Sequence, residues 1–215
     1  RKAMKKIVRI YFVFLVPFVL QAQSPEMAKK LLDDVSETIA SFENLSFDFS
    51  YVLENRPENI RQETTGSATI KGNQYKISFL GNEQLFDGEK TYTIIPENEE
   101  ITISSPEDDS GFGINPSELL VFYKTGYAYQ WDIKQNVKGR PIQFIKLIPN
   151  EENNEVKYLL LGIDMQTKVI YRLIEIGTSE TRTTLTLKNL KTNTPLNSNF
   201  FTFDGSKYPD YYINN

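Results

Sequence analysis

Alternation between apolar and polar residues is the feature that most constrains how this chain can fold. Every second residue is aromatic or aliphatic in Phe47–Leu53 and again in Tyr127–Ile133. Because successive side chains of a β-strand point to opposite faces of the sheet, each run predicts a strand with one apolar face. Shorter runs with the same period lie at residues 75–79, 91–94 and 184–188.

Turn signals separate these runs. They include Lys71-Gly72-Asn73, Asp87-Gly88 and Gly139-Arg140-Pro141, and residues of these types favour the tight backbone conformations of turns. Many strands joined by short turns predict one large antiparallel sheet that is strongly curved or partly closed.

Two segments follow the period of a helix instead. An apolar stripe from Met27 to Ile39 predicts a helix from about Pro25 to Phe42, with proline in its first turn. A second helix is predicted to begin after Asn115, which is a capping residue followed by Pro116. It is apolar on nearly all sides, as buried helices are. We therefore expect it to plug the mouth of the curved sheet.

The N-terminus predicts export. Lys5, Lys6 and Arg9 precede the apolar run Ile10–Leu20, and a small residue, Ala22, follows it. This is the layout of a secretory signal peptide, and the run is shorter than the roughly 20 residues that a transmembrane helix needs. We divide the chain into a signal peptide, 1–22, and a single domain, 23–215. Since the chain has no cysteine, no acylated cysteine can anchor it after cleavage, and we expect a soluble exported protein. A retained N-terminal anchor is the alternative.

Charge and composition exclude several functions. Five of the 24 basic residues and none of the 28 acidic ones lie in the signal segment, so the mature chain carries a net charge of −9. This balance argues against nucleic-acid binding, which needs a basic face. The absence of histidine and cysteine excludes Ser-His-Asp and Cys-His catalysis and the usual zinc sites. We expect no metal and no cofactor.

Paired carboxylates are the remaining route to an enzyme. Asp48 and Asp132 are expected to point away from the apolar face of their strands, and Asp87 lies in an Asp-Gly turn, where aspartate usually serves the backbone. We therefore do not expect an enzyme, although a small carboxylate-dependent one is kept as an alternative. The apolar face itself is either a closed core or a cavity for an apolar ligand, and periodicity alone favours the core.

Six motifs follow one another along the mature chain: an opening helix, an aromatic strand, a second strand that begins with glycine, an Asp-Gly turn before a strand that ends in proline, a helix start and a closing Phe-x-Phe. They are the segments Met27–Phe42, Leu45–Phe49, Gly66–Lys71, Leu85–Pro96, Asn115–Leu120 and Phe200–Phe203. Their order resembles that of the LolA-type periplasmic carriers of outer-membrane lipoproteins, in which the second helix is a lid, over nearly the whole mature chain. One departure is Lys71-Gly72-Asn73, where the family often has Lys-Arg-Pro with an arginine that helps to hold the lid shut.

The resemblance implies a mainly β (α+β) fold: a strongly curved antiparallel sheet that forms a half-open β-barrel, with an N-terminal helix and a short inserted lid helix over an apolar cavity. It implies a monomeric periplasmic carrier of acylated lipoproteins. An inner-membrane ABC-type release complex would load it, and an outer-membrane acceptor would receive the cargo. A lipid- or lipoprotein-sensing module on the same scaffold is the alternative. The residues expected to line the cavity and lid are Phe47, Phe49, Tyr51, Ile70, Tyr75, Ile77, Phe79, Tyr92, Ile94, Leu119, Leu120 and Phe122.

Overall fold

A single curved sheet dominates the computed structural model, which describes residues 25–105, 115–151 and 155–214. The signal peptide predicted at 1–22 lies outside this range. The strands are β1 (Leu45–Asn55), β2 (Ile60–Lys71), β3 (Gln74–Phe79), β4 (Asn82–Phe86), β5 (Thr91–Ile95), β6 (Glu100–Ser104), β7 (Tyr127–Val137), β8 (Arg140–Pro149), β9 (Val156–Asp164), β10 (Val169–Gly177), β11 (Thr181–Thr192) and β12 (Tyr212–Asn214).

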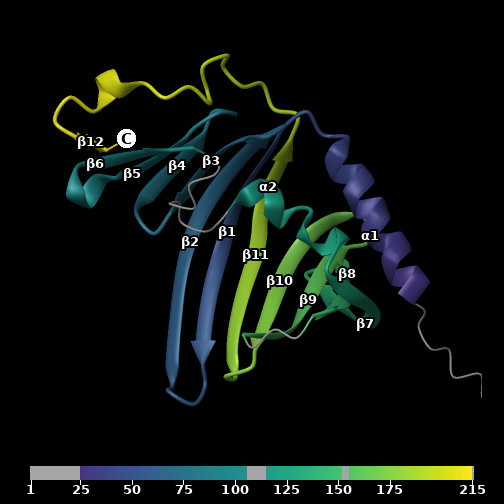
Figure 1. Ribbon diagram of the computed structural model, residues 1–215. Coiled ribbons are helices and arrows are strands. Elements are labelled where there is room, and N and C mark those ends of the chain that lie inside the picture. Colours follow the sequence, from purple (N-terminus) through teal and green to yellow (C-terminus); the bar gives the residue numbers. More distant parts are fainter. Residues whose placement is uncertain (1–24, 106–114, 152–154, 215) are drawn as a thin grey trace, which may run out of the picture.

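The twelve strands have the order β12-β6-β5-β4-β3-β2-β1-β11-β10-β9-β8-β7. Neighbours run antiparallel except β12, which joins β6 in parallel. Figure 1 shows the long strands β1, β2 and β11 in the middle, with β4–β6 turning away on one side and β7–β9 on the other. The predicted fold class, a curved antiparallel sheet that forms a half-open barrel, is confirmed.

The predicted strands all form. The run 47–53 lies in β1, 75–79 in β3, 91–94 in β5, 127–133 in β7 and 184–188 in β11. Directly opposite residues of an antiparallel pair lie on the same face, so the register defines two faces. Phe47 and Phe49 pair with Ala68 and Gly66 of β2, and these residues belong to the face that we call inner.

The helix α1 (Pro25–Ala40) covers one end of the inner face and ends two residues before the predicted Phe42. It packs against β7 and β10. Its buried stripe, Ala28, Leu31, Leu32 and Val35, joins one continuous apolar cluster with the inner residues of the sheet. No helix among the described residues is both long enough and apolar enough to cross a membrane.

Strand β7 departs from the predicted alternation after Trp131. Trp131 pairs with Ile145 and Lys134 with Gln143, so β7 holds one extra residue at this point, which is a β-bulge. The amide Nε2 of Gln143 donates to the carbonyl oxygens of Asp132 (2.7 Å) and Ile133 (3.3 Å) and so holds the bulge. Ile133 is therefore 56% exposed, and its predicted place on the apolar face is wrong.

Gly66 allows the ring of Phe49 to lie directly against β2. A Cβ atom at Gly66 would overlap Cζ of Phe49 and lie 2.6 Å from the carbonyl oxygen of Ser78. Because Phe49 is only 4% exposed, its ring has no free space to move into. We expect Gly66→Ala to lower the free energy of unfolding in urea by about 1–3 kcal/mol. The control Ser67→Ala, on the exposed face of the same strand, should change it by less than about 0.5 kcal/mol. Equal stability of both variants would contradict the close contact.

Candidate functional site

An apolar pocket of about 150 Å³ opens on the inner face of the sheet. Its floor comes from β1, β2 and β3, one wall from β10 and β11, and the other from the short helix α2 (Pro116–Leu119). Only Glu175 and Thr183 among the lining residues are polar. The full lining is Phe47, Phe49, Tyr51, Ala68, Ile77, Pro116, Leu119, Leu173, Glu175, Thr183 and Leu185.

A segment inserted between β6 and β7 covers the centre of the inner face. We call Asn115–Lys124 the plug segment; it contains α2 and the 3₁₀ turn η2 (Phe122–Lys124). Its start is as predicted, because Oδ1 of Asn115 accepts hydrogen bonds from the backbone N–H groups of Ser117 (2.9 Å) and Glu118 (3.4 Å). The cap fixes where the chain turns onto the sheet.

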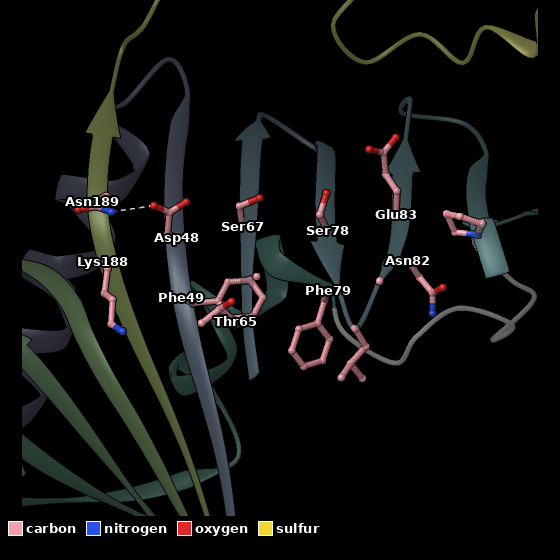
Figure 2. Close-up of a pocket in the computed structure, with 14 residues that line it drawn as sticks. Asp48, Phe49, Thr65, Ser67, Ser78, Phe79, Asn82, Glu83, Lys188 and Asn189 are labelled. Carbon is pink, nitrogen blue, oxygen red and sulfur yellow. Dashed lines mark hydrogen bonds between the residues drawn. The ribbon is translucent and has the colours of Figure 1, made fainter. Parts of the chain in front are cut away.

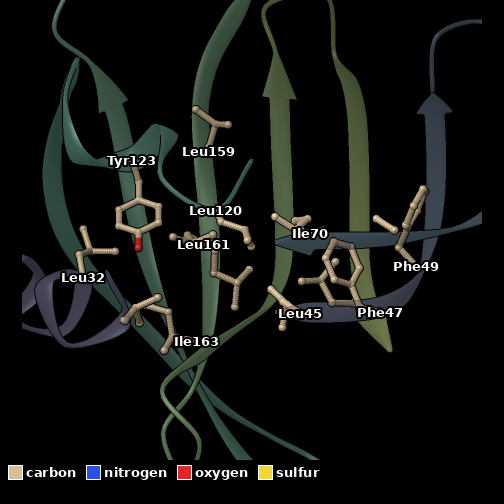
Figure 3. Packing of buried hydrophobic residues seen from close by; sticks show 14 of the residues in the cluster. Leu32, Leu45, Phe47, Phe49, Ile70, Leu120, Tyr123, Leu159, Leu161 and Ile163 are labelled. Carbon is tan, nitrogen blue, oxygen red and sulfur yellow. The ribbon is translucent and has the colours of Figure 1, made fainter. Parts of the chain in front are cut away.

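The plug segment fills most of the space beneath it. Leu119, Leu120 and Phe122 meet leucines and isoleucines of β9, β10 and β11, and no room for a ligand is left between them. Figure 3 shows Leu120 and Tyr123 above Leu161 of the sheet. Leu120 is 4% exposed and Tyr123 is fully buried. The pocket is therefore the part of the inner face that the plug segment leaves uncovered.

Hydroxyl groups tie the plug segment to its surroundings. The hydroxyl of Tyr123 shares a hydrogen bond of 3.0 Å with Oγ of Ser36 on α1. The hydroxyl of Tyr129, on β7, donates to the carbonyl oxygens of Tyr123 (2.8 Å) and Lys124 (3.1 Å). Burial raises the pKa of Tyr123, so its hydroxyl keeps its proton. These bonds join the plug segment to α1 and β7.

Most of the predicted cavity residues lie on the inner face. Phe47, Phe49, Tyr51, Ile77 and Leu119 line the pocket itself. The rest of this group belongs to the same apolar cluster but lies outside the pocket wall: Ile70, Tyr75, Phe79, Leu120 and Phe122.

Tyr92 and Ile94 lie on the opposite face, which corrects their predicted place in the cavity. Their neighbour Thr93 pairs with Gln84 of β4, and Gln84 pairs with Ile77 of β3. Because cross-strand partners share a face, Thr93 is on the inner face, and Tyr92 and Ile94 are on the outer one.

The outer surface of β5 has an apolar cover of its own. The ring of Tyr92 stacks on Phe203, with centroids 4.4 Å apart and planes 11° apart, and Phe203 stacks in turn on Tyr208. Ile94 is 2% exposed and lines a hollow of about 220 Å³ that the C-terminal segment closes. The alternation predicts the strand correctly, but it does not say which face an additional segment covers.

Six further lining residues were not among the predicted cavity residues: Ala68, Pro116, Leu173, Glu175, Thr183 and Leu185. In β10, Leu173 faces the pocket while Ile174 is buried in a small cluster on the outer face. A strand covered on both sides is apolar on both sides, so its sequence does not mark the inner residues. The useful signal is Glu175, a lone acid in an apolar strand.

A larger hollow of about 660 Å³, with a mixed polar and apolar lining, opens on the outer face (Figure 2). Asp48, Ser67, Ser78 and Glu83 form a row across β1 to β4. The amide Nδ2 of Asn189 donates to Oδ2 of Asp48 over 2.7 Å. Charged and polar side chains are therefore interspersed with apolar ones here, unlike in the apolar pocket of the inner face.

The carboxylates of this hollow are too far apart to work as a pair. Asp48 and Glu83 are separated by three strand spacings, which is about 14 Å at roughly 4.8 Å per strand. The acid pairs of inverting glycosidases are about 6.5–9.5 Å apart, and those of retaining enzymes are closer.

The other two candidate acids accept hydrogen bonds from backbone N–H groups. The Oδ1 atom of Asp87 accepts from the backbone N–H groups of Glu89 and Lys90, both at 2.8 Å. Although partial burial acts to raise the pKa of Asp87, these bonds hold it below the ordinary value. Asp132 accepts from the N–H of Ile133 (2.8 Å). Across the described ranges, no three acidic side chains gather closely enough to hold a metal ion.

Comparison with solved structures places the fold among known ones. An uncharacterised conserved protein from Thermus thermophilus is similar, with a TM-score of 0.56 and 11% identity over 87% of this chain and 98% of that one. The lipoprotein LppX of Mycobacterium tuberculosis gives a TM-score of 0.53 and 12% identity over 81% and 99%. A LolA superfamily protein from Nitrosomonas europaea gives a TM-score of 0.42 and 11% identity over 82% of this chain and 97% of that one.

No protein-family model matches the sequence, and no curated protein matches it. The fold of this chain thus occurs among solved structures, LppX included. At identities of 11–12% the likeness concerns the fold alone.

Proposed function

We propose that this protein is a periplasmic carrier that binds the acyl chains of lipoproteins on the inner face of its half-barrel and shuttles them from the inner to the outer membrane. The observation that carries the proposal is the apolar pocket beside an inserted plug segment, on a sheet whose inner face is aromatic and aliphatic. The signal peptide, the domain 23–215, the inner-membrane ABC-type release complex, the outer-membrane acceptor and the monomeric state are parts of the same proposal.

Acyl chains need such a carrier because water opposes their free diffusion. Each buried CH₂ group is worth about 0.8 kcal/mol, so a lipoprotein with two or three chains exposes apolar surface worth on the order of tens of kcal/mol. A carrier must shield that surface and later release it. A binding face that is covered in both the empty and the loaded state meets both requirements.

The size of the pocket implies that the plug segment moves when cargo binds. A volume of about 150 Å³ is close to that of an engineered cavity that binds benzene, and is below the roughly 300–1,000 Å³ of ordinary ligand sites. An acyl chain therefore replaces the contacts that Leu119, Leu120 and Phe122 make with β9, β10 and β11. Each state buries the same leucines of the sheet, which keeps the net binding energy moderate.

The test uses the purified protein and a synthetic peptide with or without acyl chains. We expect a soluble complex with the acylated peptide only, and transfer of that peptide from inner-membrane to outer-membrane vesicles. Failure to bind both the acylated peptide and an apolar fluorescent probe would refute the carrier. Binding without transfer would favour a sensing module. Mass spectrometry of lipoproteins that co-purify from the native envelope is the independent check.

A further inference from the structure

One carboxylate faces the apolar pocket. Glu175 follows Leu173 on the inner face of β10, and its cross-strand partners are Leu159 of β9 and Thr183 of β11. Both Glu175 and Thr183 line the pocket, and the other lining residues are apolar. A charged group at the wall of such a pocket decides which ligand atoms can lie next to it.

The charge of Glu175 is not compensated within the described part of the chain. Among the described residues, no hydrogen-bond donor or cation acts on the pKa of the Glu175 side chain. The negative charge of Glu155 acts on Glu175, and Glu175 in turn adds to the effect of burial in raising the pKa of the Tyr127 hydroxyl. Burial, followed by Glu155, raises the pKa of Glu175 itself. The wall of the pocket is thus negative and partly dehydrated.

From this placement we infer that Glu175 selects the head group of the ligand: the pocket favours an acyl chain that carries an ammonium group near its end. The inference rests on the proposed function and deepens it. An ammonium group would restore to the carboxylate the charge-assisted hydrogen bonds that burial removed. An anionic head group would instead meet the like charge of Glu175.

Stability supplies a second readout. Because the folded protein binds the Glu175 proton more tightly than the unfolded chain does, ionisation of this group costs stability as the pH rises above the unfolded pKa. Glu175→Gln should therefore be at least as stable as the wild type at pH 8 in the absence of ligand. This gain would disappear at pH 4, where the unfolded carboxyl group is also mostly protonated.

The test compares three amphiphiles with the same chain, dodecylamine, dodecanol and dodecanoic acid, each at a concentration at which it is dissolved as a monomer at pH 8. At this pH the amine is a cation and the acid an anion. We expect the wild type to bind dodecylammonium about tenfold or more tightly than dodecanoate, with dodecanol between them. In Glu175→Gln this preference should vanish, while the control Glu37→Gln, which removes an exposed charge from α1, should keep it.

The outcomes separate the inference from the proposed function. If none of the three amphiphiles binds, the carrier proposal fails. If all bind with equal affinity, or if Glu175→Gln keeps the preference, head-group selection by Glu175 is wrong while the carrier proposal stands.

Two further ligand comparisons, each of one test ligand with its matched control, identify the source of the ammonium group. One is a diacylated lipopeptide with a free α-amine, compared with the same peptide acylated on that nitrogen. The other is a short-chain phosphatidylethanolamine, compared with the matching phosphatidylglycerol. A preference for the free-amine peptide alone assigns the group to a protein N-terminus, and a preference for the ethanolamine lipid alone assigns it to a phospholipid. The lack of a preference in both pairs overturns the inference.

Discussion

Leu119→Glu is expected to weaken the binding of an acylated peptide by about 100-fold or more. Leu119 lines the pocket and also meets Leu173 and Leu185 of the sheet, so cargo and plug segment compete for the space around it. Full burial shifts the pKa of a carboxyl group by up to about 3–5 units, and each unit corresponds to a factor of ten. A new carboxylate at this position therefore opposes any apolar ligand.

The plug segment offers a matched control two residues away. Val121 is 39% exposed and does not line the pocket, so Val121→Glu adds the same charge without burying it. Fluorescence titration with an apolar probe should give a normal affinity for Val121→Glu and little binding for Leu119→Glu. Equal losses in both variants would point to a general charge effect, and no loss in either would remove the pocket from the binding site.

The sequence predicts the strands well where apolar residues on one face alternate with polar residues on the other. In β1, the aromatic series that begins at Phe47 alternates with serine and aspartate, and its inner face follows directly from this pattern. The same reasoning fails for Tyr92 and Ile94, because the outer face of β5 is also covered. Local alternation shows which residues of a strand are buried. It does not show whether they face the inside of the half-barrel or a segment that covers the outer face, and only the tertiary structure distinguishes the two.

The sequence likewise predicts one feature of the plug segment and not another. Its start could be predicted because a cap of Asn115 and Pro116 acts within one turn. Its attachment to α1 could not be predicted, because Ser36 and Tyr123 are 87 positions apart. Nothing in the local sequence around a hydroxyl group shows which distant group it will bond to. The bulge that exposes Ile133 depends in the same way on Gln143 of the next strand.

Tyr123 is the deepest anchor of the plug segment, and Tyr123→Ala is expected to lower the free energy of unfolding by about 3–5 kcal/mol. Its side chain is fully buried and its hydroxyl bonds to Ser36, so the variant loses both packing and a tether. The milder Tyr123→Phe keeps the ring and should lose about 1 kcal/mol. Urea denaturation of the ligand-free proteins measures both changes.

The same variants should bind apolar ligands more tightly, because the plug segment and the ligand compete for one surface. A weaker closed state raises the fraction of protein that is competent to bind, and the apparent affinity rises with it. We expect a gain of about tenfold for Tyr123→Ala and a smaller one for Tyr123→Phe. The control Tyr208→Ala removes a ring from the outer face, so it should lose stability without gaining affinity. If Tyr123→Phe and Tyr123→Ala bind no more tightly than the wild type, the plug segment does not compete with the ligand. The pocket would then accept cargo without displacement, contrary to its volume of about 150 Å³.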